Sequence, residues 1–357
     1  MITVSLCMIV KNEEDVLARC LESVGQVADE IIIVDTGSTD KTKQTAGAFT
    51  SRIFDFEWIN NFSAARNYSF SKAEMDYIMW LDADDILEEK DRTALIELKN
   101  SLKADTDVVM MKYNTSFDES GNPLFSYYRE RLVKNNGNYI WKGAVHEAIE
   151  PAGNVIYTDI SINHKKLKPS DPDRNLNIYL NMKKNGIFFS PRDRFYYARE
   201  LYYHGLFEAA AEEFEGFLSS GQGWLENELE AIKFLSECYH SMNDDIKALE
   251  TLMRAFVYDT PRAEILCDIG RYFILFGKYR QAAYWYELAL KCERNDKTGG
   301  FIKPDCYDYI PYIQLCVCYD MMGNKNKAEM YNEKAGRIKP GSASYLYNKR
   351  YFSEHLT

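Results

Sequence analysis

The stretch 77–85 is the part of the sequence that best indicates the fold, because a short apolar run ends abruptly in acidic residues. The apolar part, 77–81, has the length and composition of a buried strand, and Asp82, Asp84 and Asp85 follow where that strand should enter a loop. Carboxylates two positions apart at a strand end can reach one Mg²⁺ or Mn²⁺ ion, and substrate phosphates commonly complete such a site. The alternative is an acidic turn that caps the next helix.

Short apolar segments alternate with segments of helical periodicity along the first half of the chain. The predicted strands are 3–10, 30–34, 51–56, 76–82 and 107–113. This alternation predicts an α/β fold with a Rossmann-like mixed, mainly parallel sheet and helices on both faces. Ligands bind outside the carboxyl ends of the strands in such sheets. Asn12, Asp35 and Asp82 all lie at these ends, so three polar loops should converge on one rim.

Four motifs in this order resemble those of family 2 glycosyltransferases with the GT-A fold. They are M-I-V-K-N-E-E at 8–14, V-D-T-G-S-T-D at 34–40, F-S-A-A-R-N at 62–67 and W-L-D-A-D-D at 80–85. Four ordered motifs are far more specific than one pair of aspartates. The resemblance covers 1–165, which we take as the catalytic domain. It implies transfer of a sugar from a nucleotide diphosphate donor with inversion at the anomeric carbon.

The resemblance assigns five residues to the donor nucleotide. Asp35 matches the acid that accepts a hydrogen bond from the base, usually uracil, and Asn12 and Glu14 lie beside the nucleoside. Arg66 matches a basic residue near the nucleotide, where a guanidinium suits phosphate oxygens. Asp82 faces the ribose and the metal. The alternatives are a turn or helix cap for Asp35 and a surface position on a helix for Arg66.

The same resemblance implies a Mg²⁺ or Mn²⁺ cofactor. Asp84 is the expected direct ligand, Asp82 contributes to the same site, and Asp85 is held in reserve. A third protein ligand is often a histidine further along the chain, and His164 is placed for that role after an alternating segment. A divalent ion would stabilise the charge that develops on the diphosphate leaving group. His164 could equally be structural.

The stretch 139–147 is the best place for the base that deprotonates the acceptor. It offers adjacent His146 and Glu147, and a W-x-G-x-V-H-E stretch of this kind occurs in family members. If it is a strand, only one of the two faces the reaction centre, and the sequence does not rank them. We assign Trp141 and Asp85 to the sugar and acceptor side, where an aromatic ring can stack on a sugar.

The second half of the chain has a different character. Similar fragments recur at 205–210, 243–248, 277–282 and 323–328, and their final alanines step by 38, 34 and 46 residues. This pattern resembles tetratricopeptide repeats, in which helical pairs with small residues at their crossings stack into an array. We therefore expect an all-α repeat domain at 191–357, joined by a linker at 166–190. Such an array could bind a polypeptide, or it could form a homodimer.

Composition limits the partners and the cellular locations that fit this chain. The formal net charge of −11 argues against nucleic acid as a partner. No run is long enough for an integral membrane segment, no signal peptide is evident, and eight scattered cysteines without a CxxC indicate reduced thiols. These features are typical of a cytoplasmic protein.

Three functions remain. The leading hypothesis is a metal-dependent glycosyltransferase that moves a sugar from a UDP-sugar donor to a Cys, Ser or Thr side chain of a peptide or protein. In its domain order the chain resembles the sublancin-type peptide S-glycosyltransferases. The second is the same chemistry on a saccharide or lipid-linked saccharide of the cell envelope. The third is a repeat scaffold with an inactive catalytic domain, against which the intact acids Asp35, Asp82 and Asp84 argue.

Overall fold

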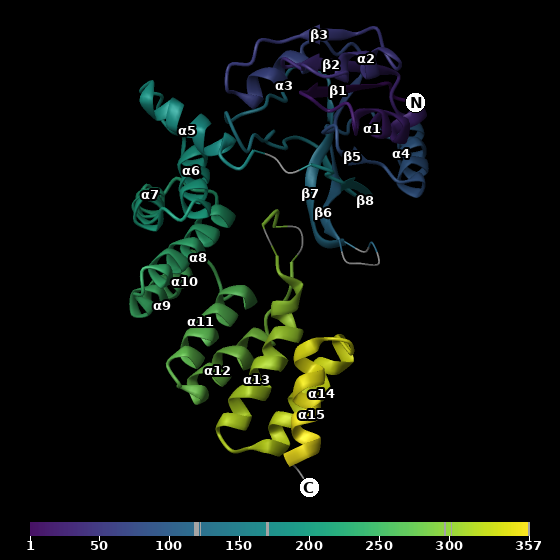
Figure 1. Cartoon of the computed structure of the whole chain (residues 1–357). Helices are drawn as coiled ribbons and strands as arrows, with labels where there is room; N and C mark the ends of the chain where they lie inside the picture. Colours follow the sequence, from purple (N-terminus) through teal and green to yellow (C-terminus); the bar gives the residue numbers. More distant parts are fainter. Residues whose placement is uncertain (118–120, 122, 169–170, 296–297, 301, 356–357) are drawn as a thin grey trace. The chain divides into compact units, whose positions relative to one another are not determined.

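The computed structural model describes residues 1–117, 121, 123–168, 171–295, 298–300 and 302–355. The chain divides into two compact units, Met1–Phe188 and Phe189–Thr357 (Figure 1). The segment 166–190, expected as a linker, contains helix α5 (Arg174–Lys184) and belongs to the first unit as far as Phe188.

The first unit is built around one mixed sheet in the order β3-β2-β1-β4-β7-β6-β8-β5. Strands β3, β2, β1 and β4 run parallel, and so do β6 and β8, whereas β7 is antiparallel to both β4 and β6. The expected mixed, mainly parallel sheet is confirmed. The strands are β1 (Val4–Val10), β2 (Glu30–Asp35), β3 (Ile53–Asp55), β4 (Tyr77–Trp80), β5 (Asp85–Ile86), β6 (Val108–Phe117), β7 (Pro123–Lys134) and β8 (Val155–His164).

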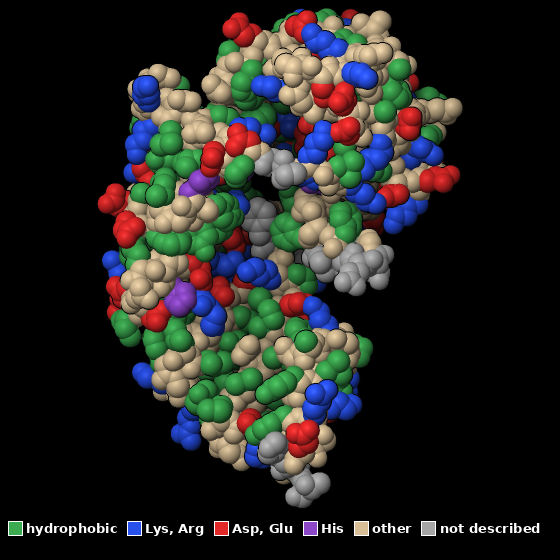
Figure 2. Space-filling model, in the orientation of Figure 1, with side chains coloured by type: hydrophobic (Ala, Val, Ile, Leu, Met, Phe, Trp, Pro, Cys, Tyr) green, Lys and Arg blue, Asp and Glu red, His purple; other side chains and the backbone are tan. Residues whose placement is uncertain are grey.

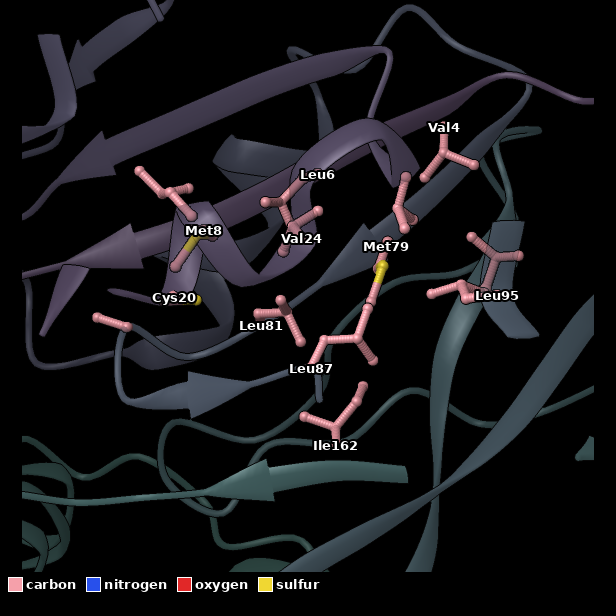
Figure 3. Close-up of a cluster of buried hydrophobic side chains, with 14 of the residues drawn as sticks. Val4, Leu6, Met8, Cys20, Val24, Met79, Leu81, Leu87, Leu95 and Ile162 are labelled. Atoms are coloured by element: carbon pink, nitrogen blue, oxygen red, sulfur yellow. The ribbon is translucent and has the colours of Figure 1, made fainter. Parts of the chain in front are cut away.

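Alternating side chains of β1 pack on opposite faces of the sheet, as the two-residue period of a strand requires. Val4, Leu6 and Met8 enter one buried cluster with side chains of α1 and α4 (Figure 3). Cys7 enters a second cluster with Trp80 on the other face, which α3 covers. The helices of this unit besides α5 are α1 (Leu17–Val24), η1 (Gly25–Val27), α2 (Thr42–Gly47), α3 (Phe62–Phe70) and α4 (Glu89–Ser101).

One expectation about local structure is wrong. The stretch 139–147 is not a strand but a loop, with a single bridge between Lys142 and Ala148. Gly143 and His146 have φ values of 96° and 51°, which lie outside the β region. Strand alternation therefore does not decide which of His146 and Glu147 faces the site.

The second unit is an array of helical pairs in which successive helices pack against one another. The alanines that end the four repeated fragments, Ala210, Ala248, Ala282 and Ala328, are all fully buried, which confirms the repeat pattern. The helices are α6 (Pro191–Tyr203), α7 (Phe207–Ser219), α8 (Leu225–Ser241), α9 (Asp245–Met253), α10 (Ala255–Tyr258), α11 (Ala263–Leu275), α12 (Tyr279–Ala289), η2 (Pro304–Tyr307), α13 (Tyr309–Met321), α14 (Lys325–Ile338) and α15 (Ala343–His355).

The first residue of each repeated fragment sits in the turn between the two helices of a pair. Gly205, Asn243, Gly277 and Gly323 have φ values of 71°, 64°, 69° and 80°. Glycine and, less readily, asparagine tolerate this left-handed conformation. The turn geometry explains why these residues recur where the repeats begin.

The visible surface carries acidic and basic side chains in mixed distribution, with hydrophobic side chains scattered between them (Figure 2). Of the helices in the described part of the chain, none is both long enough and apolar enough to cross a membrane.

Candidate active site

A cleft of about 810 Å³ opens where β1, β2 and β4 end. This volume falls within the range of roughly 300–1,000 Å³ that is usual for small-molecule sites. Seven of the residues expected at the site line the cleft, and they are Asn12, Arg66, Asp82, Asp84, His146, Glu147 and His164. The other four, which are Glu14, Asp35, Asp85 and Trp141, do not line it.

Arg66 connects two walls of the cleft. It lies on α3, whose first turn is capped by the Asn61 side chain accepting from the Ala64 amide. Its Nη2 donates to Asp82 Oδ1 at 2.6 Å and its Nε donates to Glu147 Oε1 at 2.7 Å. The guanidinium packs between the rings of Trp80 and Trp141, 5.1 and 4.8 Å from their centroids. Arg66 is therefore an interior link between two carboxylates and not a surface residue.

The environment of Asp82 favours its charged form. Burial alone would raise the pKa of this carboxyl, but the Arg66 guanidinium, Arg131 and the hydrogen bond from Arg66 outweigh it and hold the pKa at about 2. With one oxygen occupied by Arg66, Asp82 is less available as a metal ligand than the sequence suggested.

The structure gathers Asp84, Asp85 and His164 into one cluster, with one ligand atom of each within 4.8 Å of the others. His164 Nδ1 lies 3.2 Å from both Asp84 Oδ1 and Asp85 Oδ1. The pairing of β5 with β8 places Asp85 directly opposite His164. The expected metal pair Asp84 and His164 is thus brought together, with Asp85 rather than Asp82 beside them.

Asp85 cannot serve the sugar or the acceptor, which corrects the expectation from the sequence. Its side chain has no exposed surface, and Arg131 Nη1, itself fully buried, donates to its Oδ2 at 3.0 Å. The backbone amide of Asp82 donates to the same oxygen at 3.0 Å. Asp85 therefore holds the acidic loop in place from inside the protein.

The expectation that Trp141 lies on the sugar and acceptor side is also corrected. It is only 2% exposed and packs edge-on against Trp80, with ring centroids 4.8 Å apart. Its ring supports the Arg66 guanidinium from within the core and cannot stack on a sugar in this arrangement.

The donor set fits a cation that prefers oxygen ligands. Asp84 and His164 remain partly exposed to the cleft, with side chains 18% and 25% accessible. Burial lowers the pKa of the His164 imidazole, but Asp84 and Asp85 outweigh this effect and raise it to about 10. Positive charge stabilises the cluster of His164 with the two carboxylates, and either a proton or a divalent ion can supply that charge. Carboxylate oxygen with one imidazole suits Mn²⁺, and carboxylate with diphosphate oxygens suits Mg²⁺.

Asn12 and Glu14 join the first two strand-end loops. Asn12 Oδ1 accepts from the Thr39 amide at 2.8 Å, and Glu14 Oε2 accepts from the Lys41 amide at 2.9 Å. Asn12, with φ of 57°, reaches the cleft, whereas Glu14 is used as a brace between the loops.

Asp35 stabilises a turn with one of its carboxylate oxygens, and the other oxygen takes no part in that turn. Its Oδ1 accepts from the amides of Gly37 and Ser38 at 2.9 and 2.8 Å. Its Oδ2 is buried and accepts no hydrogen bond from any residue that the structure describes. A buried carboxylate oxygen without a donor is costly, so this atom suits a ligand N–H.

His146 and Glu147 both line the cleft, because the loop that carries them turns at His146 and does not alternate like a strand. The Ser63 hydroxyl and the Phe62 amide at the start of α3 anchor this loop by donating to the carbonyls of Gly143 and Ala144, at 2.5 and 2.9 Å. Both candidates for the base therefore remain.

Two contributors to the cleft were not expected from the sequence. Glu13 lies in it, and burial together with Asp84 and Asp82 raises the pKa of its carboxyl to about 7. The described part of 166–175, expected as a linker, contributes Lys166, Lys168 and Arg174. The cluster of basic residues there was visible in the sequence, but nothing local placed it beside the acidic loop.

Comparisons with known proteins agree with this geometry. Residues 5–150 match the family described as Glycosyl transferase family 2. Over 152 residues the chain is 35% identical to a TPR repeat-containing protein of Synechococcus elongatus, covering 42% of this chain and 36% of that protein. Over 216 residues it is 29% identical to the SPbeta prophage-derived glycosyltransferase SunS of Bacillus subtilis, covering 56% of this chain and 49% of SunS.

Two further proteins also align with this chain. The lipopolysaccharide core biosynthesis glycosyltransferase LpsC of Rhizobium meliloti is 29% identical over 161 residues, or 42% of this chain and 58% of LpsC. A solved thermophilic TPR protein of Thermus thermophilus aligns with 52% of this chain and 91% of its own, at 20% identity and a TM-score of 0.36.

The alignments span only 36% to 58% of the length of these curated relatives. Within that share, the matched segment contains the strand-end loops, Arg66, the acidic loop and Glu147, all of which meet at one cleft. Residues 5–150 of this chain therefore form a family 2 glycosyltransferase domain.

Proposed function

We propose that this protein is a metal-dependent glycosyltransferase that moves a sugar from a UDP-sugar to a Cys, Ser or Thr side chain of a peptide or protein. The observation that carries the proposal is the convergence, in one cleft of a family 2 domain, of Asp84 and His164 with the candidate bases His146 and Glu147. A cation site and a proton acceptor on neighbouring loops are the two requirements of a direct displacement with inversion.

In the proposed reaction the acceptor sulfur or oxygen attacks the anomeric carbon while the bond from that carbon to the phosphate oxygen breaks. The acceptor proton passes to Glu147 or His146, and the nucleoside diphosphate departs. Asp84 and His164 would hold Mg²⁺ or Mn²⁺, which supplies charge stabilisation for the leaving diphosphate when bound. Asp35 Oδ2, buried and without a donor, would accept from the base, and Asn12 would contact the nucleoside.

The second unit would engage the acceptor or a second copy of the chain. Stacked helical pairs present an extended surface suited to a polypeptide segment. This assignment rests on the helical array and on the resemblance of the domain order to peptide S-glycosyltransferases.

A saccharide or lipid-linked saccharide acceptor is the second candidate. LpsC is named for lipopolysaccharide core biosynthesis and matches 42% of this chain, which favours this acceptor class. The two candidates share the donor half of the site and differ only in the acceptor.

The test is a donor screen with the full chain. Nucleotide diphosphate release is followed for a panel of nucleotide sugars with Mn²⁺ or Mg²⁺, for the native protein and for Asp84→Asn, with Asp159→Asn on the exposed part of β8 as the control. We expect release that needs the metal, is lost in Asp84→Asn and is retained in Asp159→Asn. Absence of release with every donor, together with no stabilisation by UDP and metal, would refute the proposal.

A further inference from the structure

The aromatic surface of the cleft comes from the segment that joins β3 to α3. Among the described residues that line the cleft, Trp58 contributes an indole ring and Phe62 a phenyl ring. Trp141, which the sequence placed on the sugar side, is buried and does not supply this surface. The rings of Trp58 and Phe62 meet edge to face, with centroids 4.8 Å apart. A planar group of a ligand can therefore contact an aromatic ring inside the cleft.

Of these two rings, Trp58 is the one that suits a ligand. The Phe62 ring is covered by the Arg174 guanidinium, which lies 4.9 Å from its centroid. Trp58 is partly exposed, and its Nε1 donates to Asn60 Oδ1 at 3.0 Å. An indole has a single N–H to donate, so this bond fixes the direction of the ring. What Trp58 offers a ligand is the face of its π system.

The order of the strands places Trp58 at the nucleoside end of the cleft. Asp55 pairs with Asp35 across β3 and β2, and the Phe56 amide donates to the Asp35 carbonyl at 2.9 Å. The chain that leaves β3 therefore starts beside the carboxylate proposed to accept from the base, and Trp58 follows two positions later.

The same order separates Trp58 from the candidate cation site. Strands β3, β2, β1 and β4 are neighbours in that order, and the acidic loop follows β4. Three strand spacings, about 14 Å, thus lie between the end of β3 and the end of β4. The anomeric carbon of a donor sugar is bonded to the diphosphate, which belongs beside the cation. A ring at the opposite end of the cleft therefore suits the base and not the sugar.

We propose that the nucleobase of the donor stacks on the indole of Trp58. This inference rests on the proposed function, because it concerns the same donor. Trp58 would contact the face of the base, while Asp35 Oδ2 would accept from an N–H on its edge. Stacking tolerates every base, since each has a π face. Trp58 thus supplies affinity for a nucleoside diphosphate, and the hydrogen bond at Asp35 supplies the choice of base.

The test measures binding of UDP and of inorganic pyrophosphate to the full chain by isothermal titration calorimetry with Mn²⁺. Pyrophosphate lacks the nucleoside, so it reports on the cation and diphosphate contacts alone. We expect Trp58→Ala to raise the UDP dissociation constant about 5- to 150-fold and to leave the pyrophosphate constant unchanged. Trp58→Phe, which restores a ring, should recover most of the affinity for UDP. The matched control is Ile59→Ala, on the same segment and 58% exposed, which should change neither constant.

An unchanged UDP constant in Trp58→Ala would overturn the inference and leave the proposed function intact. Equal weakening of UDP and pyrophosphate would also overturn it, because Trp58 would then act on the shape of the cleft and not on the base. Failure of the native protein to bind UDP would overturn both the inference and the proposed function.

If Trp58→Ala does not fold, proton NMR of the native protein with UDP and the diamagnetic ion Mg²⁺ decides. Trp58→Phe identifies the indole signals of Trp58. We expect saturation of these ring protons to reduce the H5 and H6 signals of uracil, because stacked rings lie in van der Waals contact. Absence of that transfer would overturn the inference.

Discussion

Arg66 shows how one side chain can connect two loops that line the cleft. Its two hydrogen-bonding edges are both occupied, one by Asp82 and the other by Glu147, and its faces are covered by tryptophan rings. Breaking a buried ion pair from one side leaves the partner charges unpaired, which costs more than the pair contributes. The stability of the site thus depends on this residue more than on either carboxylate.

We expect Arg66→Met to lower the free energy of unfolding by about 2–4 kcal/mol, because two partly buried carboxylates lose their counter-charge. Urea denaturation at pH 7 measures the change. Adding Glu147→Gln should restore part of the loss, because one of the stranded charges is then gone. Lys43→Met, which removes an exposed pair with Asp55, serves as the control and should leave the midpoint in place. A midpoint unchanged in Arg66→Met would contradict the role described.

The raised pKa of Glu13 predicts that the free energy of unfolding depends on pH. Burial, Asp84 and Asp82 raise its pKa from 4.5 to about 7, so folding favours its protonated form. Its contribution to stability is fully present below about pH 4.5 and is lost as pH rises through 7. Glu13→Gln should therefore match the native protein at pH 5 and exceed its unfolding free energy by about 1–2 kcal/mol at pH 8.5 after solvent screening. Urea denaturation in EDTA tests this, and an equal effect at both pH values would speak against it.

For individual residues, the sequence predicted which side chains line the cleft better than it predicted their interaction partners. Asp84, His164, His146 and Glu147 were named from motifs and do line the cleft. The different roles of Asp82 and Asp85 were not predicted, because they are decided by tertiary contacts with Arg66 on α3 and with Arg131 on β7. The contacts of the Tyr113 hydroxyl with Asp85 and His164 had no local signal in the sequence, because the three residues lie on three different strands.

Among the elements, the parallel strands were predicted from their apolar runs, whereas two structures were missed for identifiable reasons. Strand β7 mixes aromatic and aliphatic residues with charged ones in no simple alternation, and its pairing with β4 is a tertiary contact. The 139–148 loop contains aromatic and β-branched residues typical of strands, but positive φ values at Gly143 and His146 turn it back toward α3. Backbone conformation of this kind is imposed by the fold and is hard to recognise in one sequence.

The turns between paired helices offer a direct test at the level of elements. Asn243 occupies a left-handed position that glycine fills in the other three repeats, with φ of 64°. Asn243→Gly should be neutral or stabilise by up to about 0.5 kcal/mol, whereas Gly277→Ala, at φ of 69°, should destabilise by about 1–2 kcal/mol. Chemical denaturation of the full chain gives both values. The prediction fails if Gly277→Ala is as stable as the native protein.

In the molecule as a whole, the two units have separate hydrophobic cores. The clusters around β1 and around α3 lie within Met1–Phe188, and the cluster of α11 to α15 lies within Phe189–Thr357. The division in the sequence between alternating strands and repeated helical fragments anticipated two units of different class. The sequence did not predict that 166–175 contributes to the cleft, because a basic stretch before a helix is not by itself a sign of a binding site.

We expect residues 1–188 expressed alone to fold, since the cleft and both faces of the sheet are complete within them. Circular dichroism should show a cooperative thermal transition, and the fragment should retain metal-dependent release of nucleotide diphosphate from the donor identified with the full chain. Loss of acceptor transfer with retained donor hydrolysis would assign acceptor recognition to the helical unit. A fragment without a cooperative transition would show that the first unit depends on the second.

The double use of Arg66 also restricts how the cleft of this protein can diversify. Its Nε and Nη2 each have one acceptor, Glu147 and Asp82, which lie 65 positions apart in the chain. A graft that brings a new 139–148 loop, intended to change which acceptor is glycosylated, must supply a carboxylate that meets Nε, or the donor loop will be disturbed as well. The two loops therefore have to be exchanged together. We expect functional chimeras to be those that exchange α3 along with both loops.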